Sequence, residues 1–161
     1  MSLEKSYVFT TTSSEENQRL GERISRLLTS PLTILLVSDL GGGKTTFTKG
    51  LATGLGISST VHSPTYTLHR SYSVDSSASI TSLDHFDLYR TDEDDTIAWV
   101  IQELLEQDSS LLVIEWPNKS VRALLSDFIE VNIDIKGEDR VFSFYPHGPK
   151  ANRLISQLEV M

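Results

Sequence analysis

The sequence contains no cysteine, which excludes disulfide bonds and thiolate metal sites. It also lacks long hydrophobic runs. Uninterrupted apolar stretches such as Ile34 to Val37 and Leu111 to Ile114 fall far short of the roughly 20 residues needed to cross a bilayer. The N-terminal segment, Met1 to Ser6, has no apolar core of signal-peptide length. We therefore expect a cytoplasmic protein with no membrane partner.

Positive charge is also scarce, since 14 Lys and Arg residues against 22 Asp and Glu residues give a formal net charge of −8. Proteins that bind nucleic acid on their own usually carry a basic surface that displaces counterions from phosphates. Direct, tight binding of RNA or DNA by this chain alone is therefore disfavoured. The 161 residues contain no repeat or linker, and we expect one domain spanning residues 1–161.

Strand and helix patterns alternate along the chain. Apolar and β-branched runs predict strands at 7–12, 32–37, 66–74, 80–88, 111–115, 128–135 and 140–145. Helical spacing predicts helices after Ser13, at 44–55, at 91–106 and at 151–158. The short link at 75–79 favours antiparallel pairing of the strands that it joins. We expect an α/β fold, a P-loop NTPase-like layered domain with a mixed, largely parallel central sheet flanked by helices.

The loop after the second strand carries the clearest functional signal. It reads Ser38-Asp39-Leu40-Gly41-Gly42-Gly43-Lys44-Thr45, with a buried strand before it and a helix after it. This context indicates a phosphate-binding loop, because glycines let backbone amides approach phosphates and the helix N-terminus adds unpaired N–H groups. Ser38 stands where such loops usually begin with glycine. The alternative is a glycine-rich turn that binds no ligand.

The polar residues at the end of this loop each have an expected role. We expect Lys44 to reach the β- and γ-phosphates of a nucleotide, the Thr45 hydroxyl to bind magnesium, and Thr46 to hydrogen-bond the α-phosphate. The three glycine amides are expected to surround the phosphate chain. Together these features predict a site for a nucleoside triphosphate and its Mg²⁺ ion.

A carboxylate is expected at the end of a neighbouring strand, because P-loop proteins use one to hold the magnesium sphere. The run Leu111 to Glu115, four apolar residues followed by an acid, makes Glu115 the candidate. The alternative is a surface glutamate that merely ends a strand. The segment Asn118 to Val121 is similar to the guanine-reading Asn-Lys-x-Asp motif but lacks its acid, so ATP is favoured over GTP.

Four sequence blocks follow one another between residues 38 and 117: Ser38-Asp-Leu-Gly-Gly-Gly-Lys-Thr-Thr46, Ser63-Pro-Thr-Tyr-Thr-Leu68, His85-Phe-Asp-Leu-Tyr-Arg90 and Ile114-Glu-Trp-Pro117. In order and spacing they resemble the TsaE family, the bacterial P-loop ATPases of tRNA threonylcarbamoyladenosine biosynthesis. The sequence departs from the family at Ser38 and in the helix after Arg90, which lacks the family's usual proline. That helix could touch a partner, so the departure concerns partner affinity.

The resemblance implies roles at the phosphate end of the site. Lys44, Thr45 and Thr46 match the family's phosphate- and magnesium-binding residues, and Glu115 matches its magnesium-binding acid. Asp87 matches an aspartate that the family needs for ATP hydrolysis. The expected catalytic residues are therefore Lys44, Asp87 and Glu115, with Thr45 and Glu115 as metal ligands.

Three further matches concern the surroundings of the nucleotide. Thr65 matches a switch-like loop that faces the γ-phosphate, Trp116 matches a tryptophan beside the nucleotide, and Ser14 matches a segment near the base. For Asp87 the alternative is a structural pairing with His85 or Arg90.

The resemblance further implies a weak, Mg²⁺-dependent ATPase that acts with TsaD and TsaB-like partners, with the tRNA held only through those partners. The acidic balance of the chain agrees with this expectation. Two alternatives stay open from the sequence. The first is a P-loop small-molecule kinase, and the second is a non-hydrolysing adaptor whose interactions are gated by nucleotide.

Overall fold

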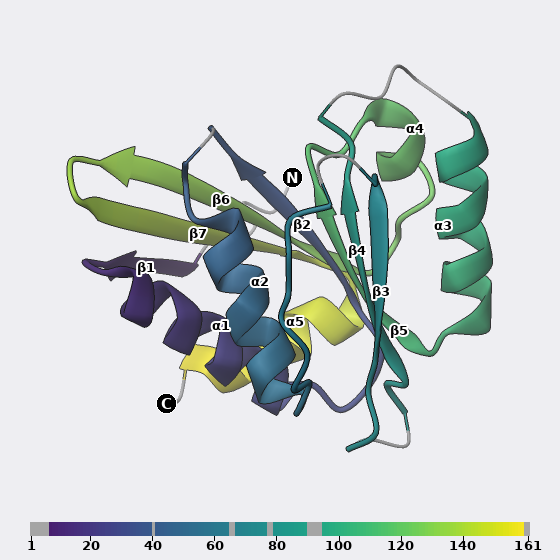
Figure 1. The fold of residues 1–161 in the computed structure, drawn as a ribbon, viewed down its shortest axis with the longest axis horizontal. Helices are drawn as coiled ribbons and strands as arrows, with labels where there is room; N and C mark the ends of the chain where they lie inside the picture. Colours follow the sequence, from purple (N-terminus) through teal and green to yellow (C-terminus); the bar gives the residue numbers. More distant parts are fainter. Residues whose placement is uncertain (1–6, 40, 65–66, 77–78, 90–94, 160–161) are drawn as a thin grey trace.

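The computed structural model describes residues 7–39, 41–64, 67–76, 79–89 and 95–159. Along the chain its elements are β1 (Tyr7–Thr11), α1 (Ser14–Leu27), β2 (Thr33–Ser38), α2 (Lys44–Gly54), β3 (His69–Ser73), β4 (Ser82–Asp87), α3 (Asp95–Gln107), β5 (Ser110–Glu115), α4 (Lys119–Arg122), β6 (Phe128–Lys136), β7 (Asp139–His147) and α5 (Pro149–Glu159) (Figure 1). Strands and helices alternate through much of this order, as the sequence patterns predict.

One seven-stranded sheet runs through the molecule in the order β1-β7-β6-β2-β5-β4-β3. The four central strands, β6, β2, β5 and β4, are parallel neighbours. Pairing is antiparallel between β1 and β7, between β7 and β6, and between β4 and β3. It follows that β7 and β3 run against the other five strands, which confirms the predicted α/β fold with a mixed, largely parallel sheet.

Helices cover the sheet on both faces and create two cores (Figure 1). Strand β2 contributes to both, because Ile34 and Leu36 pack with α1, α2 and α5, whereas Leu35 packs with α3 and α4. A strand buried on both faces needs apolar residues at nearly every position. This requirement explains the continuous apolar run that predicted β2.

Helix α1 begins at a capped N-terminus, directly after Ser13. The Ser13 side chain accepts a hydrogen bond from the amide of Glu16 at 3.2 Å, and the Glu16 carboxylate accepts one from the amide of Thr12 at 2.6 Å.

Helix α2 approaches α1 closely at two glycines. A Cβ at Gly21 would lie 2.3 Å from the Phe47 carbonyl oxygen, and one at Gly50 would lie 2.0 Å from the Gln18 carbonyl oxygen. This contact holds the start of α2 against α1.

Two elements differ from the sequence prediction. Helix α4 was not predicted, because its four residues are too short for a periodic pattern, although the Asn118 side chain caps it by accepting from the Val121 amide at 2.9 Å. Helix α3 is described from Asp95, and the predicted start at residues 91–94 lies outside the described residues. Within the described part of the chain, no helix is both long and apolar enough to cross a membrane.

Candidate functional site

The carboxyl ends of β2, β4 and β5 meet around a pocket of about 420 Å³. Such an edge of parallel strands is where open α/β sheets place their ligands. The pocket is lined by Gly41, Gly42, Gly43, Lys44, Thr45, Thr46, Ser63, Asp87, Tyr89, Glu115 and Trp116. It therefore gathers every site residue predicted from the sequence except Ser14 and Thr65. Thr65 lies outside the described residues.

The glycine-rich loop, residues 39–43, depends on its glycines for space and for backbone conformation. Gly41 and Gly43 have φ angles of 81° and 99°, in the left-handed region that favours glycine. A Cβ at Gly42 would lie 1.6 Å from the Ser38 hydroxyl oxygen. That hydroxyl donates a hydrogen bond to the Asp39 carbonyl at 2.8 Å. The serine at the loop entrance thus fits only because Gly42 has no side chain.

Lys44, the first residue of α2, places a buried cation beside this loop. Its Nζ donates to the carbonyl oxygens of Ser38 at 3.3 Å and Asp39 at 3.2 Å, and it lies 4.7 Å from the centroid of the Trp116 ring. Burial lowers the pKa of Lys44, and the negative charges of Glu115, Asp87 and Asp39 offset part of that effect. A phosphate group would add negative charge and hydrogen-bond acceptors for this partly desolvated ammonium.

Two acids face Lys44 from adjacent strands. Asp87 ends β4 and Glu115 ends β5, and the strand register pairs these two residues directly. Both side chains are almost completely buried. The Asp87 carboxylate accepts from the Tyr89 amide at 3.0 Å. The Glu115 carboxylate lies 2.5 Å from His85 Nε2. Arg90, the other alternative partner of Asp87, lies outside the described residues.

The side chains around the pocket also fit a magnesium ion. The Thr45 hydroxyl and the carboxylates of Glu115 and Asp87 supply the hard oxygen ligands that Mg²⁺ prefers. Across the described ranges, no group of three or more His, Cys, Asp or Glu side chains is arranged to hold a metal ion. Mg²⁺ commonly binds through one or two protein carboxylates together with waters and substrate phosphates. The donor set therefore suits a metal that arrives with a phosphate ligand.

Ser14 lines an adjoining cavity of about 180 Å³. The two cavities share Gly41, Gly43 and Thr46. The adjoining cavity also contains Asn17, Glu138 and Arg140, which sequence reasoning missed. Arg140 donates to the Gly41 carbonyl at 3.4 Å across a separation of 99 residues, and no local motif could have revealed that contact.

Tyr89 and Trp116 form the aromatic wall of the main pocket. Their ring centroids are 4.9 Å apart, and Trp116 has a φ of 55°, which an L-residue rarely adopts. Sequence reasoning named Trp116 but missed Tyr89, which follows Asp87 by two residues. The half-buried Trp116 also contacts Lys44, so the aromatic wall and the buried cation form one unit.

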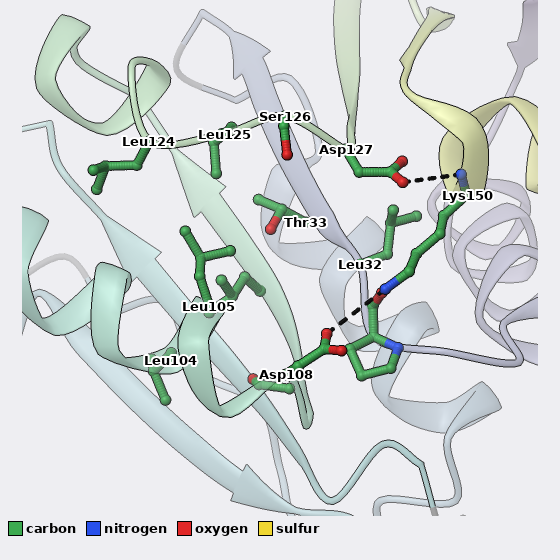
Figure 2. Close-up of a pocket in the computed structure, with 13 residues that line it drawn as sticks. Leu32, Thr33, Leu104, Leu105, Asp108, Leu124, Leu125, Ser126, Asp127 and Lys150 are labelled. Carbon is green, nitrogen blue, oxygen red and sulfur yellow. Dashed lines mark hydrogen bonds and ion pairs between the residues drawn. The ribbon is translucent and has the colours of Figure 1, made fainter.

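A second pocket, of about 200 Å³, lies at the opposite end of β2 and β5 (Figure 2). Its walls are largely leucine, and its charged groups are engaged within the protein. Lys150 Nζ lies 3.6 Å from Asp108 and 3.4 Å from the Pro31 carbonyl (Figure 2). Asp127 accepts from the amides of Lys150 at 3.0 Å and Ala151 at 2.9 Å, which caps α5. These contacts serve the fold, and the loop pocket remains the candidate site.

Comparisons with known proteins agree with the family resemblance of the sequence. A family model described as "Threonylcarbamoyl adenosine biosynthesis protein TsaE" matches residues 11–142. The chain is 34% identical over 128 residues to the tRNA threonylcarbamoyladenosine biosynthesis protein TsaE of Haemophilus influenzae, covering 76% of this chain and 78% of that protein. It is 32% identical over 149 residues to the protein of the same name in Bacillus subtilis, covering 92% and 90%.

A solved structure agrees in fold. The crystal structure of Bacillus subtilis YdiB matches with a TM-score of 0.79 and covers 99% of this chain and 97% of that chain. The sequence identity in this alignment is 24%, so the likeness bears on the fold alone. Because the family model spans most of the sequence and several relatives exceed 30% identity, the chain belongs to the TsaE family.

Proposed function

We propose that this protein binds Mg²⁺ and ATP, hydrolyses ATP slowly, and acts in the biosynthesis of threonylcarbamoyladenosine in tRNA. The observation that carries the proposal is the convergence of Lys44, Asp87 and Glu115 on one pocket beside the glycine-rich loop. Membership of the TsaE family supports the tRNA-modification pathway, since the matched relatives are named for it. ATP is favoured over GTP because the segment after β5 lacks the acid that would read guanine.

In this proposal each residue has a physical task. The loop amides and Lys44 bind the phosphates, and the Thr45 hydroxyl and the Glu115 carboxylate hold the metal. Mg²⁺, when bound, neutralises charge on the β- and γ-phosphates. Asp87 orients a water molecule for attack on the γ-phosphate. Trp116 lines the same pocket, and Ser14 in the adjoining cavity lies on the side proposed for the base.

The protein is proposed to act in the cytoplasm with TsaD and TsaB-like partners, which would hold the tRNA. The net charge of −8 supports this division, because a surface with excess negative charge does not displace counterions from RNA. ATP binding would change the surface that the partners meet, and hydrolysis would reset it.

The test begins with ATP binding measured by calorimetry, with Mg²⁺ and with EDTA. We expect ATP to bind more tightly with Mg²⁺, and we expect slow release of phosphate. A pull-down with TsaD and TsaB should recover a complex that depends on ATP. Loss of that dependence would remove the pathway assignment. Transfer of labelled phosphate to a metabolite would support a small-molecule kinase instead.

A separate assay addresses the non-hydrolysing adaptor. Asp87→Asn keeps the size of the side chain and removes its charge. If the variant binds ATP, releases no phosphate and still supports tRNA modification in cells, hydrolysis is dispensable and the adaptor function is correct. We expect the variant to bind ATP and to fail in modification.

A further inference from the structure

His85 contacts a residue that lines the pocket. With a relative exposure of 0%, it is more deeply buried than Lys44, Asp87 or Glu115. It lies on β4, two residues before Asp87, and therefore shares the pocket face of that strand. The strand register pairs Asp87 with Glu115, which places His85 diagonally across from the Glu115 side chain. The resulting contact between His85 Nε2 and Glu115 Oε2 measures 2.5 Å.

The surroundings of the other ring nitrogen of His85 indicate which atom carries the proton in this contact. Nδ1 is buried and has no hydrogen-bond partner within the described part of the chain. A proton on Nδ1 would leave a buried N–H donor unsatisfied, which is costly. A ring with its proton on Nε2 and none on Nδ1 avoids that cost and donates to Glu115. His85 is therefore a fixed hydrogen-bond donor to one oxygen of the carboxylate.

Because of this contact, the two carboxylate oxygens of Glu115 differ in their hydrogen bonding. Oε2 is held by His85, whereas Oε1 accepts no hydrogen bond from the described residues. The carboxylate is 3% exposed, lines the pocket and lies near the Lys44 ammonium. Without His85 the side chain could rotate toward Lys44 and the free oxygen would lose its direction.

We propose that His85 is a positioning residue that fixes the Glu115 carboxylate through Nε2–H and leaves its other oxygen directed at the metal. This inference rests on the proposed function, in which Glu115 binds Mg²⁺. Partners of this kind orient metal ligands, and their removal commonly lowers metal affinity about 10- to 100-fold. His85 itself touches neither the nucleotide nor the metal.

Two amide substitutions separate positioning from mere filling of the core. In His85→Gln the side-chain amide nitrogen can occupy the place of Nε2 and still donate to Glu115. In His85→Asn the amide is one methylene shorter and cannot reach the carboxylate. Both variants put an amide in the same buried place, so they differ chiefly in whether the donor reaches Glu115.

His69→Asn provides the matched control. His69 Nε2 also contacts a buried carboxylate, Asp84, at 2.8 Å, but Asp84 lies on the opposite face of β4 from Glu115. This variant disturbs a histidine–carboxylate pair of the same kind outside the pocket. It should leave ATP binding and its dependence on magnesium unchanged.

The measured quantity is magnesium enhancement, the ratio of ATP affinity with Mg²⁺ to ATP affinity in EDTA, determined by calorimetry on the full chain. We expect His85→Asn to lower it about tenfold or more, His85→Gln to retain most of it, and all variants to keep the wild-type affinity in EDTA. Retention of full enhancement by His85→Asn would overturn the positioning role and leave the proposed function standing. Absence of enhancement in the wild-type protein would overturn both.

A second measurement needs no substitution. Nitrogen-15 NMR of the histidine rings in the metal-free wild-type protein reports which nitrogen of His85 carries the proton. We expect Nε2 to be protonated and Nδ1 to be bare. A proton on Nδ1 would contradict the donor role, and this readout decides the question even if a His85 variant fails to fold.

Discussion

Strand β4 carries two carboxylate–histidine contacts on its two faces, and they differ in how completely the carboxylate is satisfied. On one face Asp84 accepts from His69 through Oδ1 at 2.8 Å, and from Ser82 at 2.8 Å and Ser110 at 2.5 Å through Oδ2. On the other face the Glu115 carboxylate has His85 on one oxygen only.

The difference separates a carboxylate that holds the fold together from one that can bind a ligand. Both acids are nearly buried, at 2% exposure for Asp84 and 3% for Glu115, so burial alone does not distinguish them. Asp84 has donors on both oxygens and no need of a further partner. Glu115 keeps one oxygen available and shares its surroundings with the Lys44 cation. The comparison predicts that substitutions at the two acids affect different measurements.

The largest expected effect concerns catalysis at the pocket. Asp87→Asn should lower the rate of ATP hydrolysis roughly 100-fold or more, because it removes the group proposed to orient the attacking water. Asp84→Asn should leave the rate per folded molecule unchanged. Both rates come from phosphate release at saturating ATP and Mg²⁺. Equal losses in the two variants would mean that Asp84 also belongs to the catalytic machinery.

The next effect concerns stability, for which the substitution at Asp84 has a larger effect than the substitution at the pocket acid. Asp84→Ala should lower the free energy of unfolding by about 3 kcal/mol, because it leaves His69 and two serine hydroxyls without their buried acceptor. Glu115→Ala removes one hydrogen bond and should cost about 1 kcal/mol. Urea denaturation of both variants measures the difference. A larger loss for Glu115→Ala would contradict the structural role assigned to Asp84.

A smaller effect appears in the pH dependence of stability. Burial alone would raise the pKa of Asp84, but hydrogen bonds from His69, Ser110, Ser82 and Ser71 outweigh it and lower the pKa from 3.8 to about 2. Because the folded pKa lies below the unfolded one, this stabilisation is complete above about pH 4 and is lost as the pH falls toward 2.

The loss over this interval should approach about 2 kcal/mol in the wild-type protein. Asp84→Asn cannot ionise, so its free energy of unfolding should fall less over the same interval. Urea denaturation of both proteins at several values between pH 5 and pH 2.5 gives the comparison. Identical slopes would show that other carboxylates account for the acid sensitivity.

Sequence patterns could predict the elements of the site but not the partners within it. The loop at Ser38 to Thr45 was predictable because a buried strand, glycines and Gly43-Lys44-Thr45 occur consecutively. Glu115 was predictable as a strand-ending acid, whereas Asp87 was named through the resemblance to the TsaE family. That His85 contacts Glu115 depends on β5 lying beside β4 in a particular register, and one sequence carries no direct signal of register.

The same reason explains why the adjoining cavity was missed. Arg140 and Asn17 reach the glycine-rich loop from β7 and α1, through packing between segments far apart in the chain. Helix α4 was missed for a local reason, since four residues give no periodicity. Short-range patterns therefore predict strands, loops and their terminal residues, whereas contacts between distant segments require the sheet order.

The smallest expected effect concerns a polar group of the phosphate loop that already has a hydrogen-bond partner within the protein. It tests whether such a group contributes to ligand binding. The Ser38 hydroxyl already donates to the Asp39 carbonyl at 2.8 Å, so, like Asp84, it has its partner within the protein. Ser38→Gly should therefore change ATP affinity little. Gly42→Ala should weaken ATP binding strongly, because its Cβ would lie 1.6 Å from the Ser38 hydroxyl oxygen and 2.8 Å from the Ser38 Cβ.

Combining the two substitutions makes the small effect measurable. In the double variant the two contacts with Ser38 disappear, and the contact with the Asp39 carbonyl, at 3.2 Å, remains. Ser38→Gly should therefore restore part of the affinity that Gly42→Ala removes, a coupling that calorimetry on the four proteins quantifies. Additive effects would show that Gly42 is required for its backbone near the ligand and that Ser38 does not determine the need for glycine there.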